Sequence, residues 1–167
     1  PEKHYYEWQN DGFTEFPQER CETDVLIEEK SKDIENLLDK QLFAMFYKKR
    51  FLDLIHNFII FDKGIKKVCR YNQYYAIKRA QYRLTEEKRG GIIWHTQGSG
   101  KTLTMIWLSK WILANHPNAR VLIVTDREEL DDQIEKAYKG VDEKIIRTKS
   151  GDDLVRRLNA YDDRLLC

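Results

Sequence analysis

The sequence predicts an α/β fold, a parallel sheet with helices on both faces, preceded by a mainly helical segment. From about residue 90, short apolar runs alternate with helical patterns in the order β-α-β-α-β-α-β. Right-handed crossover connections stack such strands side by side in one parallel sheet. A glycine-rich turn, Gly-Ser-Gly-Lys-Thr at residues 98–102, lies between the first predicted strand and its helix. Ligands of such sheets bind at the carboxyl ends of the strands, where this turn is expected.

The chain divides by pattern into a mainly helical linker, residues 1–64, and a sheet domain, residues 65–167. Residues 1–33 have no clear period, and five aromatic side chains there are expected to act as apolar anchors: Tyr5, Tyr6, Trp8, Phe13 and Phe16. Glu28-Glu29-Lys30 is similar to the E-x-K end of a nuclease motif whose carboxylates hold Mg²⁺. No companion aspartate is identifiable, so a charged strand end is the favoured interpretation.

Apolar spacing predicts the elements of the linker and of the segment before the glycine-rich turn. Apolar side chains recur every three and four residues over 34–46, which indicates a helix. A second helix is predicted over 49–57. A short strand at 58–61 and a turn at 62–64 follow. Residues 70–84 then form a tyrosine-rich helix.

Four strands are predicted in the sheet domain, at residues 91–94, 120–124, 144–147 and 164–167. Pro117 ends the helix after the glycine-rich turn, because proline cannot continue it. Asp126 is expected to cap the next helix and Gly140 to end it, with a capping box completed by Glu129. Its expected buried stripe is Leu130, Ile134, Ala137 and Tyr138. Ser150 caps a last helix whose expected inward residues are Leu154, Val155 and Leu158. Three tryptophans are assigned to the core: Trp94, Trp107 and Trp111.

The glycine-rich turn has the chemistry of a phosphate-binding loop. Its residues are Gly98, Ser99, Gly100, Lys101 and Thr102. Glycines let successive backbone N–H groups point at one anion, and the helix N-terminus adds partial positive charge. Lys101 is expected to reach the outer phosphates and the Thr102 hydroxyl to contact Mg²⁺. The full pattern asks for glycine where the chain has His95, and a solvated glycine turn would leave the adjacent Gly-Lys-Thr unexplained.

Two further groups of residues are candidates for ligand contact. The Gln73 amide can donate and accept at once, so it can pair with the edge of adenine, and Tyr71 or Tyr74 can stack on the base. Taken alone, Gln73 is more simply a solvated helix residue. Thr125, Asp126 and Arg127 can hold a nucleic-acid phosphate, although an N-cap and a solvated arginine explain them equally well. Arg147-Thr148-Lys149-Ser150 is a second group of side chains that could contact phosphate. A polar loop with a capping serine is the favoured interpretation.

Three stretches together resemble the restriction (R) subunit of type I restriction–modification enzymes. They are Arg70-Tyr71-Asn72-Gln73-Tyr74-Tyr75-Ala76, Gly91-Ile92-Ile93-Trp94-His95-Thr96-Gln97-Gly98-Ser99-Gly100-Lys101-Thr102, and Val121-Leu122-Ile123-Val124-Thr125-Asp126-Arg127-Glu128-Glu129-Leu130-Asp131-Asp132-Gln133. The Trp-His-Thr-Gln before the loop resembles this family more than helicases at large, and it accounts for His95. The resemblance covers roughly residues 34–160.

The resemblance implies an ATP-dependent motor of the superfamily 2 helicase type, coupled to a nuclease. It implies a P-loop, RecA-like lobe that binds ATP and Mg²⁺ and moves double-stranded DNA before cleavage. By motif position, Gln73 would read adenine, and Tyr71, Thr96 and the loop residues, with Lys101 as the catalytic lysine, would bind the nucleotide. Thr125, Asp126 and Arg127 would lie near the DNA. The implied partners are the modification and specificity subunits, in a prokaryotic cytoplasm.

The same resemblance limits what this stretch is expected to do. The chain contains no D-E-x-H motif and no second motor lobe, which supply charge stabilisation in the transition state. Both ends of the chain look cut. We therefore expect an ATP-dependent type I deoxyribonuclease as the whole protein, with negligible ATP hydrolysis by this part alone.

Composition leaves several other classes of protein open and disfavours some. Charged residues make up 34% of the chain, but the net charge is only +1, so any nucleic-acid contact must be local. No apolar run approaches the ~20 residues of a membrane span, so no membrane partner is expected. The alternatives are another superfamily 2 helicase or translocase, or a nucleotide-binding adaptor without turnover. A small P-loop kinase would leave Gln73 and Thr125 to Arg127 without a role.

Overall fold

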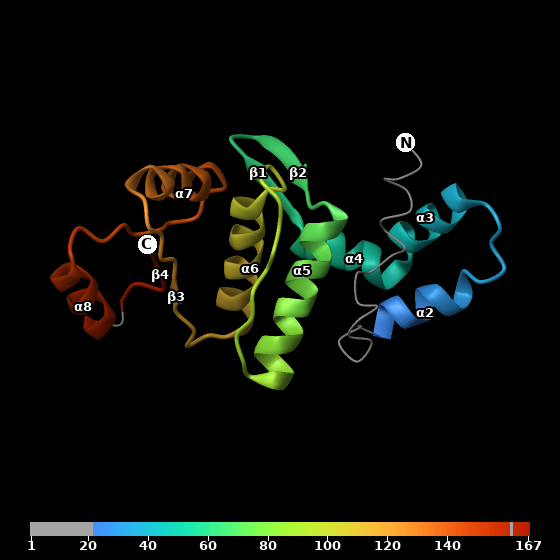
Figure 1. Ribbon diagram of the computed structural model, residues 1–167, viewed down its shortest axis with the longest axis horizontal. Helices are drawn as coiled ribbons and strands as arrows, with labels where there is room; N and C mark the ends of the chain where they lie inside the picture. The colour runs from blue at the N-terminus through green and yellow to red at the C-terminus, as the bar shows by residue number, and fades with distance from the viewer. Residues whose placement is uncertain (1–21, 161) are drawn as a thin grey trace. The chain divides into compact units, whose positions relative to one another are not determined.

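The computed structural model describes residues 22–160 and 162–167, and the aromatic anchors expected between Tyr5 and Phe16 lie outside them. These residues form helices, one short hairpin and one small parallel sheet (Figure 1). The chain divides into two compact units. The first contains the described residues up to Ile59 together with Val68–Ser99, and the second contains Ile60–Lys67 with Gly100–Cys167. Each is described by itself.

Helices make up most of the first unit. They are α2 (Glu22–Lys30), α3 (Leu37–Phe46), α4 (Lys48–Asn57) and α5 (Tyr71–Tyr82), and a π-helical turn, η2 (Arg83–Glu87), continues α5. The predicted helices over 34–46, 49–57 and 70–84 are thereby confirmed. Asn36 begins α3 through its side-chain oxygen, which accepts hydrogen bonds from the N–H groups of Leu38 and Asp39.

The expected strand end at Glu28-Glu29-Lys30 is wrong, because these residues close the helix α2. The helix has an acidic first turn, Glu22 and Asp24, and a basic last residue, Lys30, which suits the helix dipole. Lys30 lies 5.7 Å from the centre of the Tyr47 ring. A cation on an aromatic ring explains this lysine without a metal-dependent nuclease.

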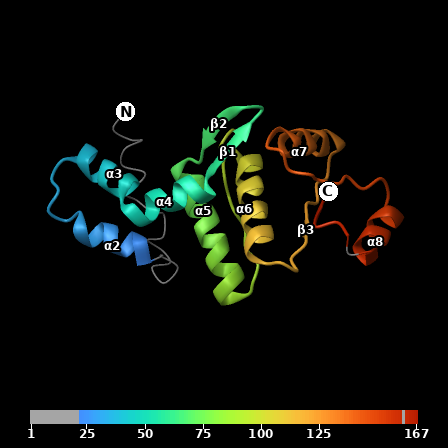
Figure 2. The same ribbon diagram turned by 180° about the vertical axis from the view of Figure 1, so that it is seen from behind.

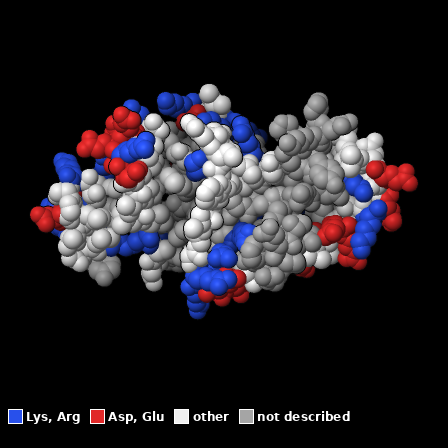
Figure 3. Space-filling model, in the orientation of Figure 1, with Lys and Arg blue, Asp and Glu red and all other residues white. Residues whose placement is uncertain are grey.

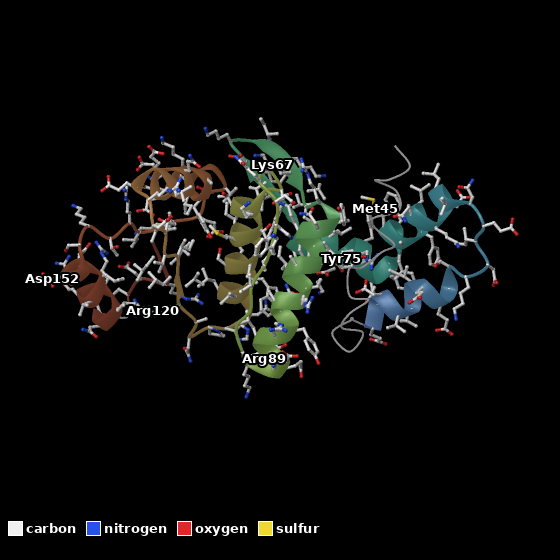
Figure 4. All side chains as sticks on the ribbon, in the orientation of Figure 1. Met45, Lys67, Tyr75, Arg89, Arg120 and Asp152 are labelled. Atoms are coloured by element: carbon white, nitrogen blue, oxygen red, sulfur yellow. The ribbon has the colours of Figure 1, made fainter. Side chains whose placement is uncertain are left out.

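A buried ion pair joins three helices of the first unit. The Arg50 guanidinium on α4 donates to the carboxylate of Asp24 on α2, and both side chains are only 2% exposed. The same guanidinium lies 5.6 Å from the ring centres of Tyr74 and Tyr75 on α5; Figure 4 labels Tyr75. Tyr74 also packs on Phe58, with ring centres 4.9 Å apart. This cluster fixes the first turns of α5.

The second unit contains the hairpin except for its outermost residues, Ile59 and Val68, together with three helices and the parallel sheet. Strands β1 (Ile59–Asp62) and β2 (Ile65–Val68) are joined by Lys63 and Gly64, whose φ angles of 50° and 81° suit a tight hairpin turn. The turn predicted at 62–64 is confirmed. The Lys63 N–H donates to the carbonyl of Gly140 at 2.8 Å, which anchors the hairpin to the end of α7 (Glu128–Gly140).

Helices α6 (Lys101–Asn115) and α7 pack through one buried polar contact and an apolar core. Trp107 on α6 is 2% exposed, and Ile106, Ile134 and Tyr138 are buried with it. The hydroxyls of Ser109 and Tyr138 lie 2.9 Å apart, and burial raises the pKa of Tyr138 to about 12. The predicted stripe is thus partly right, because Ile134 and Tyr138 are buried while Leu130 is exposed.

The parallel sheet is much smaller than the sequence predicts. Only β3 (Val121–Leu122) and β4 (Leu165–Leu166) pair, in parallel, and Ile146 adds a single bridge to Leu166. Residues 91–94 form no strand, Ile92 and Trp94 are 90% exposed, and Val124 is 80% exposed. The prediction of Trp94 as a core residue is therefore wrong. A strand persists only where a neighbour completes its hydrogen bonds, and residues 91–94 have no such neighbour among those described.

Helix α8 (Gly151–Ala160) follows the predicted pattern but buries little. Ser150 caps it, accepting the Asp153 N–H at 3.2 Å, as expected. None of its described residues is buried, and Val155 is 58% exposed, so the inward placement of Val155 is wrong. Arg120, labelled in Figure 4, ties the end of this helix to β3 through the carbonyls of Arg157 and Leu158.

Candidate nucleotide-binding site

The loop at residues 98–102 turns directly into α6. Gly98 and Gly100 have φ angles of 78° and 84°, the left-handed region that only glycine adopts at little cost. Gly100 is the residue before the helix, and no side chain caps this end. The Thr104 N–H donates to the Gly100 carbonyl at 3.1 Å, at the start of the helix. The N-terminus of a helix carries partial positive charge and suits an anion.

Side chains of the loop differ in exposure. Lys101 is exposed and Thr102 is half-buried. The Ser99 N–H donates to the Thr96 carbonyl at 3.3 Å, which closes the turn. The Ser99 hydroxyl is buried and has no hydrogen-bond partner among the described residues. A buried hydroxyl without a partner is costly, and a phosphate oxygen would satisfy it.

Gln73 lies in the first unit, in the first turn of α5. Gln73 is 3% exposed, and its side-chain oxygen accepts a hydrogen bond from the backbone N–H of Arg70 at 2.8 Å. The interpretation of Gln73 as a solvated residue is therefore excluded. Tyr71 is half-buried at the start of the same helix, and Tyr74 is buried. Gln73 belongs to the first unit and Lys101 to the second.

Thr125, Asp126 and Arg127 precede α7 in the second unit. Arg127 is the N-cap residue, so the predicted cap at Asp126, with its capping box, is wrong. Asp126 and Arg127 are both exposed, with 4.0 Å between the closest charged atoms. Thr125 is held differently, because its hydroxyl donates to the Asp131 carboxylate. The Thr125 hydroxyl and the Arg147 guanidinium hold the pKa of Asp131 below its ordinary value.

The loop at residues 147–150 meets carboxylates that the sequence reasoning missed. Arg147 pairs with Asp132 and lies 3.8 Å from Asp131. Asp131 and Arg147 face a depression of about 720 Å³ that is also lined by Glu128, Glu135, Thr148 and Lys149. The spacing of the acids along α7, at positions 128, 131, 132 and 135, puts them on one helical face. That spacing was the signal available in the sequence.

The described surface carries charges of both signs and no cluster of metal-ligating side chains. Figure 3 shows basic and acidic side chains interspersed on the face in view, and Figure 2 gives the ribbon from behind. Within the described part of the chain, no group of three or more His, Cys, Asp or Glu side chains is arranged to hold a metal. The helices described are too short or too polar to cross a membrane.

Comparison with known proteins gives one family and a consistent set of relatives. A family model described as SWI2/SNF2 ATPase matches residues 72–167, more than half of the chain. The type I restriction enzyme HindI endonuclease subunit of Haemophilus influenzae is 32% identical over 149 residues, covering 79% of this chain and 13% of that protein. The type I restriction enzyme SauCOLORF180P endonuclease subunit of Staphylococcus aureus is 36% identical over 99 residues, covering 57% and 10%. The chain thus spans about a tenth of these relatives, and the resemblance to R subunits is confirmed.

Proposed function

Because this chain belongs to the SWI2/SNF2 ATPase family, we propose that it is part of the ATP-dependent DNA-translocating motor of a type I restriction endonuclease R subunit. In this proposal the chain binds ATP and couples it to DNA movement before cleavage. The observation that carries it is the loop at residues 98–102, where two left-handed glycines lead into an uncapped helix end. The relatives' names support the restriction system.

The loop residues fit a nucleotide with Mg²⁺. Lys101 would contact the outer phosphates, and the backbone of Gly98 and Gly100 with the Ser99 hydroxyl would surround them. Thr102 would hold Mg²⁺, whose contribution when bound is to neutralise charge on the phosphates. Gln73 would read the base, Tyr71 would pack on it, and Thr96 would keep the turn closed.

Double-stranded DNA is the proposed substrate of the motor. Asp126 and Arg127 are exposed before α7, where Arg127 can contact a phosphate and Thr125 positions the turn through Asp131. The modification and specificity subunits are the proposed partners, with the prokaryotic cytoplasm as the compartment. The whole protein would be an ATP-dependent type I deoxyribonuclease.

The test places Lys101→Ala in the intact restriction enzyme that contains this chain. We expect ATP-dependent DNA movement, followed by displacement of a bound third strand, to be lost, because a charge-assisted contact of about 1.5–3 kcal/mol and its geometry are removed. Lys136→Ala, an exposed lysine on α7, is the matched control and should move DNA normally.

The result for Lys101→Ala distinguishes a DNA-translocating motor from a nucleotide-binding adaptor. Movement at the wild-type rate by Lys101→Ala would refute the proposal. Loss of ATP binding with intact subunit assembly and undiminished restriction would instead establish a nucleotide-binding adaptor without turnover. A helicase or translocase of another system would show DNA movement that needs neither the modification nor the specificity subunit.

A further inference from the structure

The tip of the β1–β2 hairpin carries exposed side chains that the proposed function does not use. Phe61 is 59% exposed and Ile65 is 67% exposed, and Lys63 and Lys66 are exposed as well. Counting outward from the two-residue turn places Phe61 opposite Lys66, so these two side chains lie on one face of the ribbon. We call Phe61, Lys63, Ile65 and Lys66 the hairpin tip. Basic side chains lie over the hairpin at the upper edge of Figure 3.

The positive charges of the hairpin tip are not balanced by the hairpin itself. Asp62 is the only carboxylate between Ile60 and Lys67, and it pairs with Lys67, which Figure 4 labels. Neither Lys63 nor Lys66 forms an ion pair with another of the described residues. Both ammonium groups can therefore meet an anion without first giving up a partner, and the exposed apolar side chains beside them add area for contact.

The backbone of Lys63 has a conformation that is unfavourable for lysine. Its φ is 50°, in the left-handed region, at the first position of the turn. Tight hairpin turns favour asparagine or glycine there, because a longer side chain is strained at a positive φ. A strained residue that is kept on an exposed turn indicates a functional role. The part of Lys63 that asparagine and glycine lack is its ammonium group.

Helix α7 holds the hairpin tip in place. The Lys63 N–H donates to the Gly140 carbonyl at 2.8 Å. A Cβ at Gly140 would overlap the Asp62 carboxylate, so the hairpin approaches the end of α7 this closely because residue 140 is glycine. A tip that is already ordered loses little conformational freedom when it binds a ligand.

Duplex DNA fits the hairpin tip better than an acidic protein surface does. The major groove of DNA admits a two-stranded β-ribbon, and phosphates that lysine side chains can contact line its edges. Apolar side chains on such a ribbon can meet the thymine methyl groups in the groove. A specific protein partner would instead bury about 20–30 residues on each side, far more than the hairpin tip offers.

We propose that the hairpin tip is a DNA-binding element in which Lys63 and Lys66 contact phosphates and Phe61 lies in the groove. The proposal rests on the proposed function in one respect, that double-stranded DNA is the substrate. It adds a second contact to that of Arg127, which precedes α7, whereas the tip is anchored at the other end of that helix. The 13 residues of α7 span about 20 Å, or about six base pairs of DNA.

The test measures how the affinity of the chain for a long fluorescent duplex falls with salt concentration. Each lysine–phosphate contact releases counterions and contributes about 0.9 to the slope of log K against log salt concentration. Lys63→Gln with Lys66→Gln should therefore reduce this slope by about 1.8. Lys32→Gln with Lys48→Gln removes the same charge from exposed lysines of the first unit and should leave the slope unchanged.

Three results would overturn the proposal. An unchanged slope in the hairpin variant would do so and would leave the tip to an acidic protein partner. An equal reduction in the control variant would show that the chain binds DNA through its charge at large. Phe61→Ala should lower the affinity by the same factor at every salt concentration, and an unchanged affinity would contradict its place in the groove.

Lys63→Asn shows whether a loss of binding reflects damage to the fold. It creates an Asn-Gly turn, which suits the left-handed φ, so the midpoint of thermal unfolding should not fall. The slope should nevertheless decrease by about 0.9. A variant that is as stable as the wild type and binds DNA with the wild-type slope would overturn the role of Lys63.

Two further measurements separate this proposal from the proposed function. Lys101→Ala, which tests nucleotide binding, should keep the wild-type slope, so failure of the nucleotide site leaves the hairpin result intact. Absence of DNA binding by the wild-type chain at low salt would overturn the hairpin tip as a DNA-binding element. DNA movement by the intact restriction enzyme would in that case still support the motor.

Discussion

Gly98 is a residue whose backbone conformation alone explains its identity. Its φ is 78°, and nothing lies within 4 Å of where a Cβ would stand. A side chain there would meet no neighbour, so any effect of adding one must come from the strain of a left-handed φ. The sequence predicted a phosphate-binding turn at this place, and the left-handed glycines support that prediction.

Gly98→Ala should therefore weaken ATP binding without disturbing packing. The left-handed conformation costs an alanine about 1–2 kcal/mol, which corresponds to roughly a tenfold loss of affinity if the loop must keep this shape to bind. Gly90→Ala is the matched control, because Gly90 also has open space and no positive φ. Equal ATP affinities of the two variants in a displacement titration would show that the loop does not need its left-handed turn.

Gln73 and Asp126 show how far single residues can be interpreted from the sequence. The interpretation of Gln73 as a reader of adenine rests on a resemblance alone, whereas its bond to the Arg70 N–H is a local feature of three-residue spacing that the sequence could have revealed. Asp126 had the residue type of a cap, but α7 begins two residues later, at Glu128. Helix boundaries shift by a residue or two without changing the helical pattern.

At the scale of elements, the sequence predicts the helices well and the strands only in part. Helices such as α3, α4 and α6 carry their own hydrogen bonds, so the apolar period that predicts them is local. The runs at 91–94 and 120–124 are equally apolar, yet the first forms no strand and the second pairs only at Val121–Leu122. Strands depend on neighbours that are distant in sequence, and apolar composition does not supply them.

The Asp24–Arg50 pair gives a prediction about the helices that support α5. Arg50→Met leaves Asp24 buried without its charge partner, and we expect the first unit to lose about 3–5 kcal/mol of unfolding free energy. Replacing both, Asp24→Leu with Arg50→Met, should restore most of it, because no buried charge remains. Urea denaturation followed by circular dichroism measures both variants.

The double variant is also the control for this prediction. Arg50 donates to the Ala44 carbonyl at 3.2 Å and contacts two tyrosine rings, so a packing role alone would make the double variant as unstable as the single one. A single variant as stable as the wild type would show that the pair contributes nothing.

At the scale of the whole molecule, the family is the one that the sequence motifs indicate, but the predicted parallel sheet is present only in part. The chain belongs to the SWI2/SNF2 ATPase family and is similar to type I restriction endonuclease subunits over most of its length. Its parallel sheet, however, is reduced to β3, β4 and a bridge at Ile146. The exposed apolar side chains of Ile92, Trp94 and Val124 are those that a fuller sheet would cover.

The absence of a D-E-x-H motif from this chain separates binding from turnover. In the proposed function Lys101, Thr102 and the loop backbone would hold phosphates, whereas activation of water and stabilisation of the transition state need carboxylates and arginines that the chain's motifs do not supply. We therefore expect this chain on its own to bind ATP and leave it intact, whereas the whole motor would hydrolyse it.

The most direct test incubates the chain with radiolabelled ATP, Mg²⁺ and double-stranded DNA and identifies the nucleotide that the protein retains. The account predicts one equivalent of nucleotide per chain, recovered as ATP and not ADP, and none retained by Lys101→Ala. Retention by Lys101→Ala equal to that of the wild type, or no retention by the wild type, would contradict nucleotide binding at residues 98–102. Recovery of ADP at a rate stimulated by DNA would contradict the separation of binding from hydrolysis.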